Sequence, residues 1–339
     1  MTNASTLRKG LLAAVVAFAA CGGAATSTDP VGPPASGTPA PTPTPTPAPP
    51  ADPGPPPVVP PVDKGIGHVF VIVMENHNWV DIKGSPSAPY INGTLLPLGS
   101  HAENYMNPPG LHPSLPNYLW LEAGTNFGIR NDSAPSTNHQ STTNHLVTLL
   151  QAAGISWKSY QEDISGTACP VTATGKYAPK HNPMVYFDDV TSSPARCIEH
   201  VRPYTELARD LEVDTVPAYS FITPNLCNDM HDSSGCASGD SIRNGDAWLS
   251  REVPKILGSP AFKRDGVLFI TFDEGQGSND GPIGLIALSR YAKGGGYSNT
   301  IRYTHSSLLR TVQHIFKVTP LLGDAANAID LGDLFTDWR

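Results

Sequence analysis

Two stretches of apolar residues, 69–74 and 266–272, place the strongest constraint on the fold of this chain. The first consists of six apolar residues, mostly β-branched, and such a run is typical of a strand buried on both faces. Polar residues follow each stretch at once: Glu75-Asn76-His77-Asn78 after the first and Asp273-Glu274-Gly275 after the second. Ligands of open α/β sheets bind beyond the carboxyl ends of the strands. We therefore expect both polar clusters to face a single crevice.

Strand-like and helical patterns alternate along the rest of the sequence. Strand-like runs occur at 68–74, 155–160, 218–222, 266–272 and 283–288. Helical patterns occur at 118–122, 144–153, 204–211, 242–257 and 306–316. This alternation predicts an α/β fold, in which helices cover both faces of a mostly parallel, doubly wound central sheet.

A serine between two prolines, in Pro113-Ser114-Leu115-Pro116-Asn117, is the best candidate for a nucleophile. Proline restricts its own backbone and that of the residue before it, so we expect Ser114 on a stiff turn with an exposed hydroxyl. Asn117 is placed to donate to an oxyanion, and the helix expected through Tyr118 would direct its N-terminus at an approaching anion. His112 is a further candidate contact for phosphate. Taken alone, the motif also fits a proline-rich surface turn.

Oxygen-bearing side chains of the two polar clusters indicate a cation site. Glu75, Asn76, Asp273 and Glu274, with the hydroxyl of Ser114, are the ligand types that hard cations prefer. One acid pair at a strand end can be a helix cap or a turn, but two pairs together with a serine favour a divalent metal ion. Such ligands suit calcium, magnesium or manganese, and nearby histidines admit iron or zinc.

Five blocks, in order from about residue 66 to the C-terminus, carry a family resemblance. They are Met74-Glu75-Asn76, Pro113-Ser114-Leu115-Pro116-Asn117-Tyr118, Asp229-Met230-His231-Asp232, Phe272-Asp273-Glu274-Gly275 and Thr304-His305-Ser306-Ser307-Leu308-Leu309-Arg310-Thr311. Together they resemble the bacterial and fungal phosphoesterase family, which holds metal-dependent acid phosphatases and phospholipases C within the alkaline-phosphatase superfamily. One departure is His77-Asn78-Trp79, which replaces the Arg-Ser-Phe-Asp that often follows the Glu-Asn pair in the phospholipase branch.

The resemblance implies an alkaline-phosphatase-like fold and a role for each matching residue. Ser114 is similar to the phosphate-accepting nucleophile of the family, and His231 and His305 are similar to its active-site histidines. The implied metal ligands are Glu75, Asn76, Asp273, Glu274, Ser114 and Asp232.

These residues predict a metal-dependent phosphoric ester hydrolase, specifically an exported acid phosphatase that acts on phosphomonoesters through a phosphoserine intermediate. The cation would lower the pKa of the serine hydroxyl, and His231 or His305 would protonate the leaving alcohol. The expected partner is a small phosphomonoester, or a phospholipid such as a phosphoinositide. Two alternatives remain, a phospholipase C-type phosphodiesterase and a non-catalytic surface-binding protein on the same fold.

The first 65 residues predict export rather than a folded domain. Residues 1–21 have the features of a signal peptide, with an apolar run too short to span a bilayer, and Cys21 ends a segment that resembles a bacterial lipobox. We expect a lipid on Cys21 to anchor the protein to the cell envelope, and simple cleavage with secretion is the alternative. Residues 22–65, rich in Pro, Thr and Ala, predict an extended linker, which leaves 66–339 as one phosphoesterase catalytic domain.

The cysteines and the charge balance agree with an exported enzyme. Cys169, Cys197, Cys227 and Cys236 remain after Cys21, and an even number in an oxidising compartment favours disulfides. Of the three pairings, we favour Cys169–Cys197 and Cys227–Cys236, because the latter would close a short loop around the Asp229–Asp232 block. The net charge is −8, and the chain has no run of basic residues. Both features argue against nucleic acid as a partner.

Overall fold

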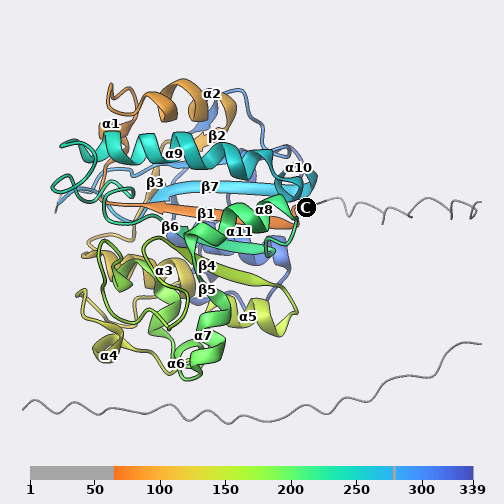
Figure 1. The fold of residues 1–339 in the computed structure, drawn as a ribbon. Coiled ribbons are helices and arrows are strands. Elements are labelled where there is room, and N and C mark those ends of the chain that lie inside the picture. Colours follow the sequence, from red (N-terminus) through yellow and green to blue (C-terminus); the bar gives the residue numbers. More distant parts are fainter. Residues whose placement is uncertain (1–64, 278–279, 339) are drawn as a thin grey trace, which may run out of the picture. The chain divides into compact units, whose positions relative to one another are not determined.

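The computed structural model of the protein describes residues 65–277 and 280–338 (Figure 1). The signal peptide and lipobox expected at 1–21, and the linker expected at 22–65 apart from its last residue, lie outside this range. No helix among the described residues combines the length and the apolar character needed to cross a membrane.

An eight-stranded sheet forms the centre of the described part of the chain, in the order β5-β4-β6-β1-β7-β8-β2-β9. Neighbouring strands run parallel, except that β8 runs antiparallel to both β7 and β2. This arrangement confirms the expected α/β fold with a mostly parallel sheet. The strands are β1 (His68–Met74), β2 (Ser100–Ala102), β4 (Trp157–Gln161), β5 (Val201–Pro203), β6 (Tyr219–Thr223), β7 (Gly266–Phe272), β8 (Leu285–Ser289) and β9 (Tyr297–Asn299). A separate parallel pair joins β3 (Tyr105–Met106) to β10 (Tyr303–Thr304).

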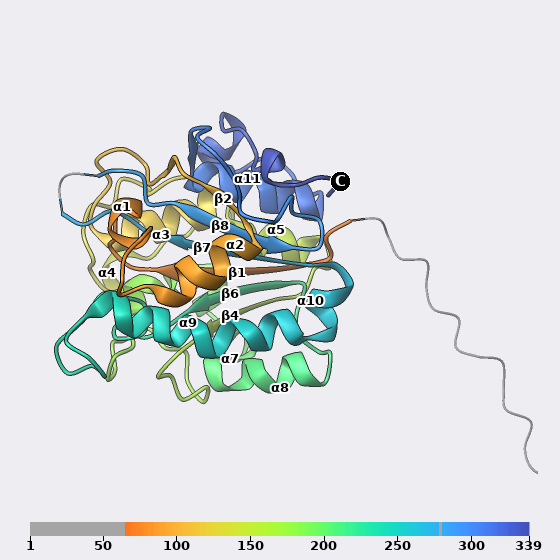
Figure 2. The same cartoon turned by 90° about the horizontal axis from the view of Figure 1, so that it is seen from above.

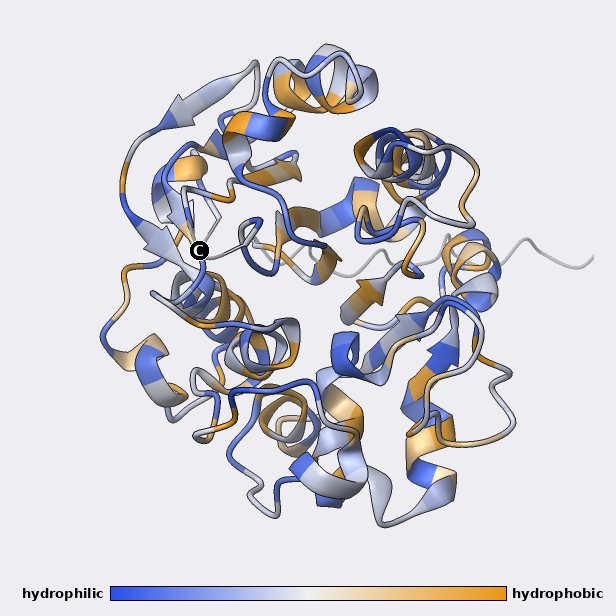
Figure 3. Cartoon of the chain, turned by 90° about the vertical axis from the view of Figure 1, so that its left-hand side faces the viewer, coloured by the Kyte–Doolittle hydropathy of each residue, from blue (hydrophilic) through white to orange (hydrophobic). Residues whose placement is uncertain are grey.

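Helices cover both faces of the sheet (Figure 2). On one face lie α8 (Leu207–Glu212), α9 (Ser241–Gly258) and α10 (Pro260–Asp265), and on the other lie α3 (Ser114–Ala123), α5 (Leu146–Ala152) and α11 (His305–Phe316). Figure 3 shows hydrophobic colouring concentrated on the central strands and on the helix sides that face them. Shorter helices are α1 (Trp79–Ile82), α2 (Leu96–Leu98), α4 (Pro135–Asn138), α6 (Asp188–Thr191) and α7 (Pro194–His200), and single turns are η1 (Ile91–Leu95), η2 (Pro179–His181), η3 (Pro183–Tyr186), η4 (Tyr204–Glu206), η5 (Gly323–Ala326) and η6 (Gly332–Leu334).

The two apolar stretches that constrain the fold become the adjacent central strands β1 and β7. Both begin and end at the predicted residues, and β7 is buried along its whole length. Met74 pairs with Phe272 in the parallel register, and the amide of Asp273 donates to the carbonyl of Met74 at 3.0 Å. The residues that follow the two strands therefore start side by side at one edge of the sheet.

Helix α3 begins four residues earlier than predicted, so Ser114 is its first residue rather than part of a preceding turn. The prolines suggested a turn, yet Pro116 fits the first helical turn because an amide there needs no partner within the helix. The helix ends at Gly124, whose φ of 67° is left-handed. Its first residue, Ser114, contacts Glu75, the residue directly after β1.

Candidate functional site

The polar clusters after β1 and β7 meet, as the expectation of a common crevice requires. The backbone amide of Asn76 donates to Asp273 Oδ1 at 3.2 Å, and its side-chain amide donates to Glu274 Oε1 at 2.9 Å. Glu75, Asp273 and Glu274 are all buried. Asn76 has a left-handed φ of 42°, a conformation that asparagine tolerates better than most residues. This turn lets one short segment present a carboxylate and an amide to the same place.

Ser114 lies against this cluster. Its hydroxyl donates to Glu75 Oε2 at 3.0 Å, and Tyr118, one helical turn later, donates to Glu75 Oε1 at 2.6 Å. The expected exposure of the serine hydroxyl was wrong, since Ser114 is only 1% exposed. The hydroxyl is buried because the first turn of α3 packs onto the carboxyl end of β1. The local sequence pattern of a turn gives no information about this packing.

Asn117 holds the cluster together instead of offering a free donor. Its side-chain nitrogen donates to Glu274 Oε2 and to the carbonyl of Leu111, both at 2.8 Å. Both amide hydrogens are therefore engaged, while its buried oxygen has no hydrogen-bond partner. In this arrangement Asn117 orients a carboxylate and the loop before Ser114.

Two of the candidate histidines have partners at both ring nitrogens. His112 Nδ1 lies 2.8 Å from Glu274 Oε2, and its Nε2 lies 3.0 Å from Asp280 Oδ1, so carboxylates occupy both ring nitrogens. His305 is buried, with Nε2 2.6 Å from the backbone oxygen of Asp273 and Nδ1 3.1 Å from the hydroxyl of Tyr105. Burial lowers the pKa of His305 to about 4, so the ring is neutral near neutral pH.

His231 and Asp232 lie in the loop after β6. His231 Nδ1 is 2.9 Å from Asp232 Oδ1, and Lys176 donates to Asp232 Oδ2 at 2.9 Å. The Asp232 carboxylate therefore contacts the side chains of His231 and Lys176 rather than the acids that follow β1 and β7. The Cys227–Cys236 disulfide closes this loop, and Cys169–Cys197 is the second bridge, so both expected pairs are confirmed.

Sequence reasoning missed two residues of the site, His181 and Asp229. His181, on η2, places Nε2 3.2 Å from Glu75 Oε1 and Nδ1 3.3 Å from Asp229 Oδ2. Glu75, His181 and Asp229 are buried, and their ligand atoms lie within 4.8 Å of one another, close enough to share a metal ion. Asp229 was within a recognised block but had no assigned role. His181 follows no strand and adjoins no acid in sequence, so only the fold reveals it.

The crowded acids carry the electrostatic signature of a site built for a cation. Burial, reinforced by Asp273 and Asp229, raises the pKa of Glu75 well above its usual range. Burial likewise raises the pKa of Asp273 to about 7 and that of Glu274 to about 9. Buried atoms without a hydrogen-bond partner include Asn76 Oδ1, Asn117 Oδ1, Asp273 Oδ2, Asp229 Oδ2 and His181 Nε2. Unpaired buried lone pairs are costly, and a divalent cation would satisfy them, so these residues fit a bound metal.

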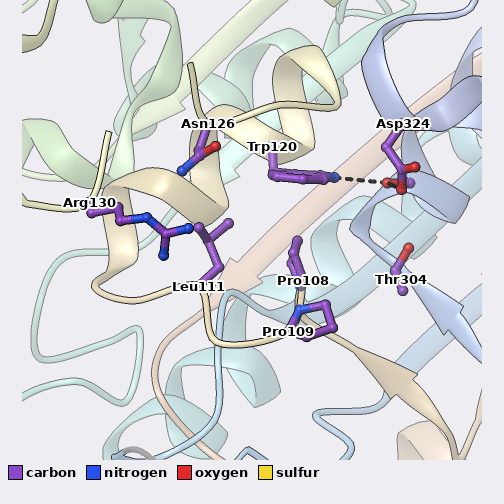
Figure 4. Close-up of a pocket in the computed structure, with 9 residues that line it drawn as sticks. Pro108, Pro109, Leu111, Trp120, Asn126, Arg130, Thr304 and Asp324 are labelled. Carbon is purple, nitrogen blue, oxygen red and sulfur yellow. Dashed lines mark hydrogen bonds between the residues drawn. The ribbon is translucent and has the colours of Figure 1, made fainter. Parts of the chain in front are cut away.

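A cavity of about 440 Å³ lies beside this cluster and contains none of the predicted site residues (Figure 4). Its walls include Leu111, Trp120 and Arg130, and the Trp120 indole donates to Ser306 Oγ at 2.8 Å. Cavity volume therefore does not identify the candidate site. The group of buried acids around Ser114 identifies it.

Solved structures share the fold at low sequence identity. A member of the alkaline phosphatase superfamily from Vibrio parahaemolyticus aligns with a TM-score of 0.53 at 10% identity, over 81% of this chain and 73% of the other. The human ectonucleotide pyrophosphatase/phosphodiesterase 5 aligns with a TM-score of 0.53 at 12% identity, over 80% of this chain and 100% of the other. At these identities the likeness concerns the fold alone, and it confirms the expected alkaline-phosphatase-like architecture.

Sequence comparisons identify the family. The model of the Phosphoesterase family matches residues 103–319. A phosphatidylinositol-3-phosphatase of Mycobacterium tuberculosis is 32% identical over 270 residues, which are 80% of this chain and 83% of that protein. A phosphate-repressible acid phosphatase of Penicillium chrysogenum is 33% identical over 170 residues, 49% of this chain but only 39% of the fungal protein. The chain belongs to the phosphoesterase family.

Proposed function

We propose that this phosphoric ester hydrolase is a metal-dependent phosphomonoesterase that works through a phosphoserine on Ser114. The observation that supports it most directly is the hydrogen bond from the Ser114 hydroxyl to Glu75, within a group of buried acids and unpaired ligand atoms. A hydroxyl held in this way combines a nucleophile with an adjacent proton acceptor.

Glu75, Asn76, Asp273 and Glu274 would hold the metal ion, and His181 and Asp229 are further candidate ligands on the other side of Glu75. A divalent cation bound there would stabilise negative charge on a nearby hydroxyl and on phosphoryl oxygens. Asp232 is not among the proposed ligands, because Lys176 and His231 already contact its oxygens.

Residues of this chain would act in two displacement steps, the formation of the phosphoserine and its hydrolysis. Glu75 orients the Ser114 hydroxyl and receives its proton as the oxygen attacks phosphorus and the ester oxygen departs. His231 protonates that departing oxygen, since its side chain is 31% exposed and Asp232 engages only Nδ1. Water subsequently attacks the phosphoserine phosphorus and gives a proton to His231, while Glu75 returns its proton to the Ser114 oxygen as the bond to phosphorus breaks and phosphate leaves. His305 and Asn117 are positioning residues: His305 holds the Asp273 backbone, and Asn117 holds the Glu274 carboxylate.

The names of the relatives suggest the substrate class. The mycobacterial relative is named for a phosphate monoester on an inositol lipid, and the fungal relatives are named acid phosphatases. We therefore propose phosphomonoesters as substrates, with phosphoinositide headgroups among them. The two disulfides support the proposal that the enzyme works in an oxidising compartment outside the cytoplasm.

Hydrolysis of p-nitrophenyl phosphate by the purified full chain tests this proposal. We expect activity that a chelator abolishes and that one divalent metal among calcium, magnesium, manganese, iron and zinc restores. Activity that survives exhaustive chelation would contradict the metal requirement. Bis(p-nitrophenyl) phosphate and phosphatidylcholine serve as diester comparisons, and a preference for either would move the assignment to a phosphodiesterase of the phospholipase C type.

A further inference from the structure

Lys180 is a cation at the candidate site to which neither the sequence motifs nor the family comparison assigns a role. It precedes His181 on η2, and its side chain is 21% exposed. Its ammonium donates to Asp132 Oδ2 at 3.0 Å, the one hydrogen bond it makes among the described residues. A lysine ammonium has three donors, so two remain for another partner.

Asp132 connects this lysine to the helix that begins with the candidate nucleophile. Its second oxygen, Oδ1, accepts the backbone amide of Leu115 at 3.0 Å. One carboxylate therefore bridges the second residue of α3 and the Lys180 ammonium. This bridge holds the ammonium next to the first turn of α3, where Ser114 lies.

The surrounding charges explain what a lysine contributes here. His181, the next residue on η2, places Nε2 3.2 Å from Glu75 Oε1, and Glu75 accepts the Ser114 hydroxyl. The positive charge of the lysine therefore lies beside the acids around Ser114. A phosphate dianion that enters this acidic site needs positive charge on more than one side.

We propose that Lys180 is a catalytic residue, which donates to a non-bridging oxygen of the phosphoryl group at Ser114, and that Asp132 is the positioning residue that holds it there. This inference rests on the proposed function. The competing explanation is a structural ion pair on the protein surface. Exposed pairs of that kind contribute little to stability and nothing to the binding of anions.

Binding of inorganic phosphate, measured by calorimetry on the full chain with each divalent metal in turn, separates the two explanations. We expect Lys180→Met to weaken phosphate binding by about 10- to 100-fold, the usual worth of a charge-assisted hydrogen bond. Lys180→Arg should recover part of this loss. Lys158→Met is the matched control, because Lys158 forms a similar, partly buried pair with Asp210, and it should bind phosphate as the wild type does.

Kinetics with p-nitrophenyl phosphate supply the second measurement. Lys180→Met should raise KM and lower kcat, because the contact forms in the bound substrate and persists as charge builds up on the phosphoryl oxygens. Asp132→Asn should have a smaller effect, and the double variant should lose little more than Lys180→Met alone, as expected when one residue acts through the other.

Wild-type phosphate affinity in a folded Lys180→Met variant would overturn the inference, whatever the variant does to stability. Additive losses in the double variant would overturn the role of Asp132. An inactive wild type whose phosphate binding still depends on Lys180 would overturn the proposed hydrolysis and leave the anion contact standing, so the two failures are distinguishable.

Discussion

At the scale of single residues, the candidate site is organised around one carboxylate. Glu75 accepts hydrogen bonds from the hydroxyls of Ser114 and Tyr118, and His181 lies 3.2 Å from one of its oxygens. A carboxylate with so many partners is held in one orientation. The serine hydroxyl therefore takes its direction from Glu75, and this pairing gives the clearest test of the mechanism.

Ser114→Ala removes the proposed nucleophile and one hydrogen bond. We expect kcat for p-nitrophenyl phosphate to fall by roughly 10³-fold or more, because the covalent step is lost, while unfolding free energy falls by only about 1 kcal/mol. Added metal should not restore activity. Steady-state kinetics and urea unfolding measure the two effects.

Ser220→Ala is the matched control, since Ser220 is equally buried but its hydroxyl has no hydrogen-bond partner. It should keep wild-type activity. If Ser114→Ala retained about a tenth of wild-type turnover, a water molecule would be the attacking group and the assignment to Ser114 would fail.

At the scale of elements, a buried histidine joins three helices at the end of α3 opposite Ser114. His145, just before α5, lies 2.9 Å from Glu122 of α3 through Nδ1 and 2.9 Å from Asp189 of α6 through Nε2. Burial alone would lower the pKa of His145, but the hydrogen bonds to Asp189 and Glu122 and their charges outweigh it and raise the pKa above 6.5. Below pH 6.5 the imidazolium form of His145 is therefore the one that links these helices.

His145→Gln should make the protein less stable by about 3 kcal/mol at pH 6, because it leaves two largely buried carboxylates without their cation. A raised pKa in the folded state means that this stabilisation is complete below the ordinary histidine pKa and is lost as pH rises through the folded value. The difference between wild type and variant in urea unfolding should therefore shrink from pH 6 to pH 9. A difference that stays constant with pH would show that His145 acts as a neutral ring.

At the scale of the whole molecule, stability should depend on the metal. The side chains that would bind it come from the ends of β1 and β7, from the loop after β6 and, as His181, from η2, so the site exists only in the folded chain. Any ligand that binds only the native state stabilises it by mass action.

Removal of metal by a chelator should lower Tm, and a metal at about 100 times its Kd should add roughly 2.7 kcal/mol, or some 5–10 °C for a domain of this size. Differential scanning calorimetry measures the shift. Asp273→Asn should show a smaller shift, because it removes one charged ligand, whereas Lys158→Met should shift as the wild type does. Equal Tm values with and without every metal tested would contradict the proposed site.

The sequence by itself determined the central strands, the acids that follow them and the disulfide pairs. β1 and β7 begin and end at the predicted residues, because a continuous apolar run specifies a buried strand locally and the register of parallel neighbours then brings Glu75 and Asp273 together. The Cys227–Cys236 pair was predictable because the two cysteines are only nine positions apart and close a short loop. The extent of each strand and the short Cys227–Cys236 loop each depend on one short segment.

Only the tertiary structure decided how the side chains of the site are partnered. Contacts between segments far apart in the sequence bury Ser114, occupy both Asn117 amide hydrogens and bury His305. Such contacts also place Lys180, His181 and Asp229 at the site. Short turns such as η2 have no periodic sequence pattern, so the local sequence does not predict which of their side chains lie near the end of a strand. Their positions follow from packing against α3 and the sheet, where each buried polar group must find a partner.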